Sequence, residues 1–268
     1  MDYEKIVSSV MKYGSTPEKA VKLALGVAPE RVREDVILAP WWEPGSLGGF
    51  TKAEPIADEP IDAIRVWDVE FYGRRATYIK TGIGASVLID PLLSLGLTPA
   101  KRVIFIGSAG ALSSEIRVGD MIVPRYSVCG DGASRYIAGD SFTKDVLLEK
   151  AYPDEALNGK LYDSAARVAK EMGLGLRWGN NFSIDTIFAQ FAHIDEITAL
   201  GCDIIEMETA CAFRAAKLMG IAMAALFLIS DNTVENKSLM GGVPKEEDRR
   251  RRAVRREAFL RIIAEALS

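Results

Sequence analysis

Short, uninterrupted apolar runs alternate with segments of helical period along most of this chain, and this alternation constrains the fold more than any other feature. Such short apolar runs are typical of strands that are covered on both faces. The expected strands are residues 36–39, 65–71, 76–81, 102–106, 120–123, 178–183, 203–205 and 222–229, and the helices among them are 85–95, 161–172, 194–200 and 209–219. We therefore expect an α/β fold, a three-layer sandwich in which a mixed, mostly parallel sheet is flanked by helices.

The two ends of the chain are predicted to be helical. Residues 1–26 should form one or two helices, since Thr16 and Pro17 are a cap followed by proline at the first helical position. With 268 residues, 49% of them hydrophobic, the chain can bury one sizeable core. We expect residues 1–30 to be an N-terminal helical appendage and residues 31–268 a single domain. The Gly- and Pro-rich residues 41–61 should be a loop, and the basic run at 249–252 should lead into a last amphipathic helix.

Composition limits the partners of the protein. A formal net charge of −4 offers no broad positive surface to a nucleic acid. Cys129, Cys202 and Cys211 lack the spacing of zinc ligands and are expected to be buried free thiols in a reducing cytosol, so we expect no metal and no cofactor. The start of the chain has no apolar signal segment, and no run approaches the roughly 18 apolar residues of a membrane span. We expect a cytoplasmic protein that acts on a small molecule and binds neither nucleic acid nor membrane.

The sequence Gly-Ser-Ala-Gly at residues 107–110 follows the apolar strand expected at 102–106. In α/β sheets, ligands collect at the carboxyl ends of the strands. Because Gly107 and Ser108 carry little side chain, backbone N–H groups there could approach an oxyanion or a sugar hydroxyl. A tight turn that needs glycine only for its conformation is an equally good interpretation.

The segment Glu206-Met207-Glu208 lies where an apolar strand meets a helix. Two carboxylates are costly at such a place unless they are used or paired. An extended backbone would direct Glu206 and Glu208 to one side and Met207 to the other. A carboxylate here can accept two hydrogen bonds from a vicinal diol; the structural alternative is a helix start that collects acids for its dipole.

Asp231 ends the most hydrophobic strand of the chain, residues 222–229 followed by Ser230. A low dielectric there would raise the pKa of the carboxyl group, which could then hold a proton near neutrality and share it with a leaving group. Asp231 is therefore a candidate general acid, and a cap on the following turn is the alternative. In residues 182–188, Ile187 and Phe188 could wall a flat aromatic ligand, although core packing explains any single member.

Taken in this order, from about Val36 to the C-terminus, the segments resemble the nucleoside phosphorylase superfamily of the purine nucleoside phosphorylase, uridine phosphorylase and methylthioadenosine nucleosidase type. Residues 103–111 with 118–123 look like that family's glycine turn and following strand, and Glu206-Met207-Glu208 looks like its ribose clamp. The resemblance implies that Glu208 binds the sugar 2′ and 3′ hydroxyls, that Met207 packs against the sugar, and that Asp231 protonates a purine N7. Glu206, Ser108 and Gly107 are further candidate binding residues.

The chain departs from the phosphorylase pattern at two places. Where those phosphorylases have a phosphate-binding arginine two residues before the first glycine, this chain has Phe105, and where a second arginine is expected the loop reads Pro-Trp-Trp-Glu-Pro at residues 40–44. Hydrolytic members have a similar Gly-Ser-Ala-Gly turn and a glutamate beyond the first strand that activates water, a place close to Glu43. The acceptor is thus phosphate, as a co-substrate, or water. Arginines of a neighbouring subunit could also reach phosphate, for example Arg65, Arg125 or Arg135.

The base is likewise left open between purine and pyrimidine. Asp231 favours a purine, whereas residues 131–134 with Tyr136 look more like the uridine phosphorylase branch. The base-stacking position, two residues after Asp185, holds Ile187, with Phe188 next to it. We expect an enzyme of nucleoside salvage that cleaves the N-glycosidic bond of a nucleoside, and, by resemblance, a homo-oligomer. The alternative is a non-catalytic nucleoside-binding protein on the same fold.

Overall fold

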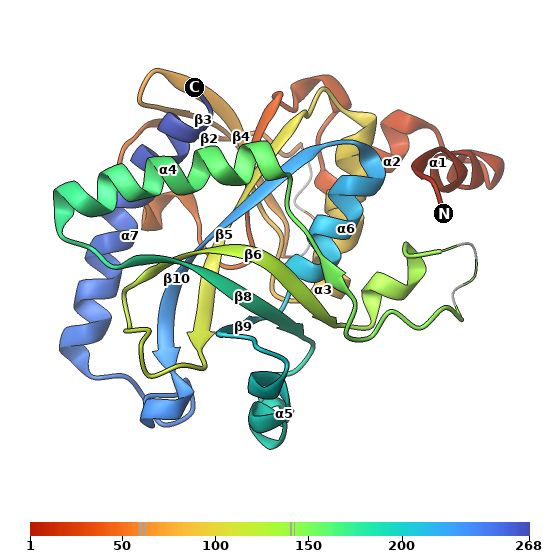
Figure 1. Cartoon of the computed structure of the whole chain (residues 1–268). Coiled ribbons are helices and arrows are strands. Elements are labelled where there is room, and N and C mark those ends of the chain that lie inside the picture. The colour runs from red at the N-terminus through yellow and green to blue at the C-terminus, as the bar shows by residue number, and fades with distance from the viewer. Residues whose placement is uncertain (59–60, 62, 140, 142) are drawn as a thin grey trace.

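One mixed sheet with helices on both faces organises the protein (Figure 1). The structure is a computed structural model that describes residues 1–58, 61, 63–139, 141 and 143–268. The strands of this described part are β1 (Asp35–Ala39), β2 (Phe50–Pro55), β3 (Arg65–Phe71), β4 (Arg74–Lys80), β5 (Arg102–Ala111), β6 (Met121–Gly130), β7 (Lys150–Ala151), β8 (Leu176–Ile184), β9 (Ile204–Glu206) and β10 (Ala222–Asn232). The helices are α1 (Tyr3–Lys12), α2 (Pro17–Leu25), α3 (Ala85–Ser94), α4 (Glu155–Met172), α5 (Ile194–Ala199), α6 (Thr209–Met219) and α7 (Lys245–Ala266).

The sheet confirms the expected α/β class and adds a closure that the sequence did not indicate. Its strand order is β10-β6-β8-β9-β5-β1-β4-β3-β2, and β10 also pairs with β5. A closed ring of paired strands is therefore formed by β5, β10, β6, β8 and β9. The sheet continues from β5 through β1, β4 and β3 to β2, which is an open edge. Parallel pairs such as β1–β5 and β10–β5 stand beside antiparallel pairs such as β5–β9 and β10–β6.

Alternating side chains on the central strands build two cores, one on each face. On β5, Val103 and Phe105 pack with residues of α2, α3 and α6, while Ile104 and Ile106 pack with residues of α4 and α7. The strand β10 divides in the same way. Because the side-chain period of a strand is two, a continuous apolar run covers both faces at once. The three layers follow from this pattern.

A tight hairpin joins β3 to β4, and the predicted cap at Thr16 is confirmed. Tyr72 and Gly73 connect β3 to β4 with positive φ at both residues, 46° and 75°, which is the turn whose twist matches a two-residue hairpin. The Thr16 hydroxyl accepts a hydrogen bond from the Lys19 N–H at the start of α2. Val21 of α2 is fully buried in the same core as α3 and α6. The division at residue 30 stays a prediction.

Two strands continue beyond their predicted ends. Residues 107–110, for which a tight turn was one interpretation, lie inside β5, whose pairing with β10 continues to Ala111. The strand β10 likewise runs on to Asn232 through Asp231. The small residues serve close packing here, since a Cβ added at Gly107 would stand 3.0 Å from the Phe105 ring. Polar and glycine residues looked like strand ends because sequence patterns do not reveal that a neighbouring strand continues to pair with them.

Other boundaries also differ from the predictions. The expected loop at 41–61 contains β2, an edge strand that pairs with β3; its positions 59 and 60 lie outside the described residues. The helix α4 starts at Glu155 because Asp154 caps it, and α7 starts at Lys245, so the basic run at 249–252 lies within a helix and not before it. This last difference places arginines beside the candidate site.

Candidate functional site

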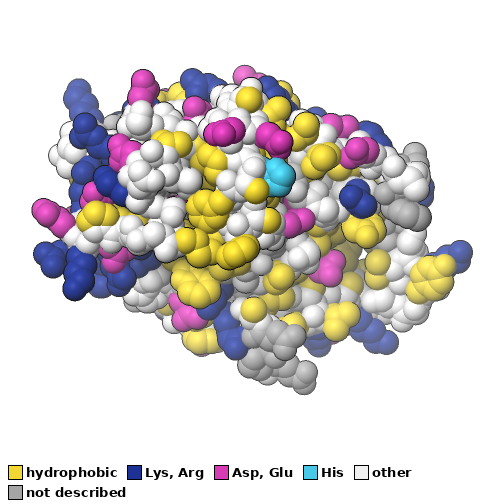
Figure 2. Space-filling view, turned by 90° about the horizontal axis from the view of Figure 1, so that it is seen from below, with side chains coloured by type: hydrophobic (Ala, Val, Ile, Leu, Met, Phe, Trp, Pro, Cys, Tyr) yellow, Lys and Arg dark blue, Asp and Glu magenta, His cyan; other side chains and the backbone are white. Residues whose placement is uncertain are grey.

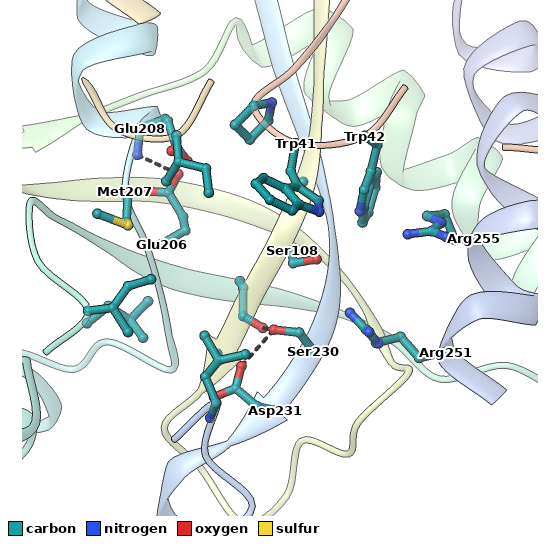
Figure 3. A pocket seen from close by; sticks show the side chains of 18 of the residues that line it. Trp41, Trp42, Ser108, Glu206, Met207, Glu208, Ser230, Asp231, Arg251 and Arg255 are labelled. Carbon is teal, nitrogen blue, oxygen red and sulfur yellow. Dashed lines mark hydrogen bonds between the residues drawn. The ribbon is translucent and has the colours of Figure 1, made fainter. Parts of the chain in front are cut away.

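A cavity of about 640 Å³ lies at the carboxyl ends of β1, β5 and β10 (Figure 3), within the roughly 300–1,000 Å³ typical of small-molecule sites. These strands are parallel neighbours, so their carboxyl ends meet at one edge of the sheet. Five segments supply much of its lining: residues 40–43 after β1, 107–110 of β5, 205–208 from the end of β9 to the start of α6, 230–231 of β10, and Arg251, Arg252 and Arg255 of α7. On the face of the molecule seen from below, hydrophobic side chains gather near the middle (Figure 2).

The structure brings most of the predicted site residues together in this cavity. Its lining includes the candidates Asp231, Glu208, Glu43, Met207, Glu206, Ser108, Gly107 and Ile187. Phe188, in contrast, does not line it and is 83% exposed, so the position beside the cavity belongs to Ile187. Gln190, which is buried, adds a polar group near Ile187.

Asp231 is held at the cavity by a β-bulge. The pairing of β10 with β5 shifts between Ile229 and Asp231, which makes Ser230 the extra residue and lets both Ser230 and Asp231 line the cavity. The Ser230 hydroxyl donates to Asp231 Oδ1 (2.6 Å), and the Leu239 N–H donates to Oδ2 (3.2 Å). Asp231 is 2% exposed, and this burial raises the pKa of its carboxyl group, against the lowering effect of its two hydrogen bonds and of the charge on Arg251.

The carboxylate of Glu206 is occupied by protein donors. It accepts hydrogen bonds from the Asn181 amide (2.6 Å), the Ser183 hydroxyl, and the N–H groups of Glu208 and Thr209 (both 2.9 Å). The last two are at the start of α6, so Glu206 takes the role of the acid at a helix start. Burial still raises its pKa, while these donors lower it. Glu206 positions the clamp segment more than it contacts the cavity.

Glu208 keeps a free oxygen. The Gly84 N–H, at the start of α3, donates to Oε1 (2.6 Å), whereas Oε2 accepts no hydrogen bond from the described part of the chain. Glu208 is 4% exposed, and its burial followed by the nearby charge of Glu206 holds its pKa well above the usual range. Because Glu206 accepts more hydrogen bonds from uncharged donors than Glu208, whose pKa the N–H groups of Gly84 and Met207 lower, the negative charge of this pair rests more easily on Glu206. A diol in the cavity would supply Glu208 with the donors it lacks.

Ser108 points to the α7 face of the sheet. Ser108 follows Ile104 and Ile106 in the two-residue period of β5 and pairs in register with Leu228. Ile104, Ile106 and Leu228 belong to the core that includes residues of α4 and α7. Phe105, at the position where the resemblance expects a phosphate-binding arginine, points to the opposite face, where its ring meets that of Phe227 at 5.8 Å. A side chain at position 105 therefore lies in the core and not in the cavity.

The loop after β1 contributes two tryptophans, Trp41 and Trp42, and one acid, Glu43, to the lining of the cavity. Trp42 is buried, packs edge-on against Phe259 with ring centroids 5.4 Å apart, and lies under the Arg255 guanidinium at 5.1 Å. Trp41 is 67% exposed at the cavity. The Glu43 carboxylate is paired with Lys80 at 2.7 Å, and its side chain is 55% exposed. This pairing competes with activation of a water molecule by Glu43.

The arginines of α7 are the lining residues that sequence reasoning missed. The run Arg249–Arg252 was expected only to lead into the last helix, because a sequence does not show where a C-terminal helix crosses the molecule. Its helical spacing was the available signal: residues 251 and 255 are four apart and share one helix face. That face meets the cavity.

Neither a metal site nor a membrane helix is apparent in the described residues. No group of three or more His, Cys, Asp or Glu side chains within residues 1–58, 61, 63–139, 141 and 143–268 is arranged to hold a metal ion. Among the same residues, no helix combines the length and the apolar character needed to cross a bilayer. Cys129, Cys202 and Cys211 are buried free thiols, and burial raises the pKa of the first two to about 11.

Similarity to known proteins agrees with this architecture. A uridine phosphorylase structure from Vibrio fischeri ES114 superposes with a TM-score of 0.71 at 22% identity, over 90% of this chain and 95% of that one. The same enzyme complexed with 6-hydroxy-1-naphthoic acid gives a TM-score of 0.72 at 23% identity, over 88% and 92%. At these identities the likeness establishes the fold.

A family model establishes the family of the chain, and relatives of lower similarity agree with it. A purine nucleoside phosphorylase of the DeoD type from Streptococcus suis (strain 05ZYH33) is 26% identical over 61% of this chain, and the match spans 66% of that relative, slightly less than two thirds of its length. Its counterpart from Actinobacillus pleuropneumoniae serotype 5b (strain L20) is 27% identical over 76% of this chain and 83% of its own length. The model of the phosphorylase superfamily matches residues 53–268. The chain therefore belongs to the phosphorylase superfamily.

Proposed function

We propose that the protein cleaves the N-glycosidic bond of a purine-type nucleoside and transfers the pentosyl group to an acceptor, phosphate or water. The observation that carries the proposal is the buried Asp231 in one cavity with the under-satisfied Glu208. The matched relatives named as purine nucleoside phosphorylases support a purine, and the uridine phosphorylase neighbours keep a pyrimidine as the alternative base.

In the proposed reaction, Glu208 holds the sugar and Asp231 serves the base. The sugar hydroxyls donate to Glu208, which orients C1′ toward the acceptor. As the C1′–N bond breaks, its electron pair moves to the base, and a proton on Asp231 passes to a ring nitrogen. The acceptor oxygen then forms the new bond to C1′, giving a sugar 1-phosphate with phosphate, or the free sugar and a released proton with water. Burial favours the protonated form of Asp231, which this step uses.

A non-catalytic nucleoside-binding protein is the second candidate. The occupied carboxylates of Glu206 and Glu43 favour it, since the first is saturated by protein donors and the second is paired with Lys80. It would use the same cavity and Glu208 but release no base.

Incubating the purified protein with a panel of purine and pyrimidine nucleosides, with and without phosphate, tests the proposal. Base released only with phosphate would identify a phosphorylase, and base released equally without it would identify a hydrolase. Binding of a nucleoside by calorimetry without any release of base would replace the proposed reaction with the binding role.

A further inference from the structure

The wall of the cavity formed by α7 is unusually rich in positive charge. Arg251, Arg252 and Arg255 all line it, and in Figure 3 the guanidinium groups of Arg251 and Arg255 point from α7 toward the part of the cavity where Ser108 lies. Figure 2 shows Lys and Arg side chains gathered on the side of the molecule where Figure 1 places α7.

Acidic side chains compensate this charge only in part. Asp248 is shared by two arginines, accepting from Arg251 Nη2 (2.5 Å) and Arg252 Nε (2.8 Å). Arg255 has no carboxylate within 4.0 Å among the described residues, and its Nε donates to the Ser46 carbonyl (3.0 Å). Within the same described part of the chain, the buried Nε of Arg251 has no acceptor. Lys80, the other cation of the lining, is taken by Glu43.

The positive groups also repel one another. Burial lowers the pKa of Arg255, and the charges of Arg251 and Arg252 lower it further. An anion bound between these groups would relieve both effects, because it supplies opposite charge and hydrogen-bond acceptors in a partly dehydrated site.

The arginines are held in place by backbone contacts between α7 and the loop after β1. The Gly48 N–H donates to the Arg256 carbonyl (3.0 Å), and a Cβ at Gly48 would stand 2.4 Å from that oxygen, so only glycine permits this approach. Arg255 adds its bond to Ser46 and its place over the Trp42 ring. The guanidinium groups are therefore positioned before a ligand arrives, which reduces the entropy lost on binding.

We propose that Arg251 and Arg255, together with the Ser108 hydroxyl, form a phosphate-binding subsite of the cavity. A guanidinium group presents paired N–H donors that match the oxygens of a phosphate, and a hydroxyl adds a further donor. In this chain the positive charge comes from the C-terminal helix, while position 105 of β5 is a core phenylalanine. The phosphate is either the free acceptor ion or an ester on the substrate sugar. This subsite extends the proposed nucleoside cleavage and rests on the same cavity.

Calorimetric titration of the full chain with inorganic phosphate, adenosine and adenosine 5′-monophosphate tests the subsite. Arg251→Gln and Arg255→Gln should each weaken phosphate binding about 10- to 100-fold, as expected when a charge-assisted contact is lost, and Ser108→Ala should weaken it about threefold to tenfold. The matched control is Arg249→Gln, which removes the same charge from an exposed position of α7 outside the cavity and should bind like the parent protein. If Arg255→Gln loosens the loop and fails to fold, Arg251→Gln and Ser108→Ala decide, because neither side chain bonds to Ser46.

The probes separate the two sources of phosphate. Arginine-dependent binding of inorganic phosphate itself supports a free acceptor. An ester is supported if adenosine 5′-monophosphate binds more tightly than adenosine, if this difference in affinity disappears in both arginine variants, and if inorganic phosphate binds little. The subsite is overturned if the parent, Arg251→Gln and Arg255→Gln bind phosphate with equal affinity. It is also overturned if the parent neither binds inorganic phosphate nor binds adenosine 5′-monophosphate more tightly than adenosine. Arginine-dependent binding without release of base from any nucleoside would refute the proposed reaction and leave the subsite standing.

Discussion

The carboxylate of Asp231 lies against the Cα of Gly110 on the neighbouring strand, where an added methyl group would meet both carboxylate oxygens at 3.4 Å and the Ile205 side chain at 3.3 Å. The two residues are partners in the β5–β10 register, just after the bulge. Glycine at this position therefore leaves the room in which Asp231 takes its conformation. This contact makes Gly110 a positioning residue for the proposed general acid.

We expect Gly110→Ala to reduce the rate of base release more than it reduces stability. Overpacking of this kind typically costs about 1–3 kcal/mol of unfolding free energy, and a small displacement of a reacting group can lower the rate by roughly 100-fold. Denaturant unfolding and steady-state kinetics on the same preparation measure both effects. Gly159→Ala, at a helix position where a Cβ meets nothing within 4 Å, is the control. An unchanged kcat in Gly110→Ala would remove Gly110 from the site.

Asp231→Asn should lower kcat by about 10²- to 10⁴-fold, the usual contribution of a general acid, and keep the fold. The amide retains an oxygen for one of the two donors, Ser230 and Leu239, but has no acidic proton to give. A synthetic riboside whose leaving group needs no protonation should lose far less, which separates proton donation from substrate positioning. The exposed acid Asp195 gives the control variant Asp195→Asn. Equal losses on both substrates would contradict the assignment.

Glu208→Gln should bind nucleoside more weakly than the parent protein does, but at high pH it should be more stable against unfolding than the parent. The parent carboxyl has its pKa raised well above the ordinary value of 4.5, so the folded state favours the protonated form. Stability of the parent relative to the variant should therefore fall as the pH rises from about 4.5 through the raised folded-state pKa. Urea unfolding of both proteins between pH 4 and pH 8 measures this difference. A difference that grows in the opposite direction would show that Glu208 is stabilised as an anion.

The loss of nucleoside binding in Glu208→Gln has its own expected size. Leaving a buried sugar hydroxyl without its acceptor costs about 1–3 kcal/mol, so affinity should fall roughly 10- to 100-fold. Calorimetric titration with a nucleoside and with its 2′,3′-dideoxy analogue checks the cause. The dideoxy compound should bind parent and variant alike, and a parallel loss for both ligands would separate Glu208 from the sugar hydroxyls.

Glu206→Gln should destabilise the protein more than Glu208→Gln does. Within the described part of the chain, the groups that hydrogen-bond to the Glu206 carboxylate are donors, including Asn181, Ser183 and the N–H of Thr209, so an amide nitrogen placed there would face donors without an acceptor. Leaving buried groups unsatisfied in this way costs about 1–3 kcal/mol. Thermal and denaturant unfolding measure it at pH 7. Stability equal to that of the parent would mean that Glu206 is already protonated in the folded protein.

The fold followed from the sequence wherever the side-chain pattern itself carried the information. The apolar run of β10 divides between two faces because a strand alternates, and the caps at Thr16 and Gly220 mark helix ends through local geometry. The edge strand β2 was missed since its side chains are mostly exposed and its pairing with β3 is long-range. Local preferences are weakest where tertiary pairing decides the structure.

By itself the sequence determined that Asp231, Glu208 and Ser108 follow apolar runs that form strands of one α/β sheet. Only the tertiary structure decided how each group is used. In the folded protein, the Glu206 carboxylate accepts hydrogen bonds from the N–H groups at the start of α6, and Oε2 of Glu208 has no donor among the described residues. The Phe105 side chain packs in the core. It also carried Arg251 and Arg255 across to the Ser108 face of the sheet. Hydrogen-bond satisfaction and charge balance depend on contacts between residues far apart in the chain, and such contacts exist only after the layers have packed.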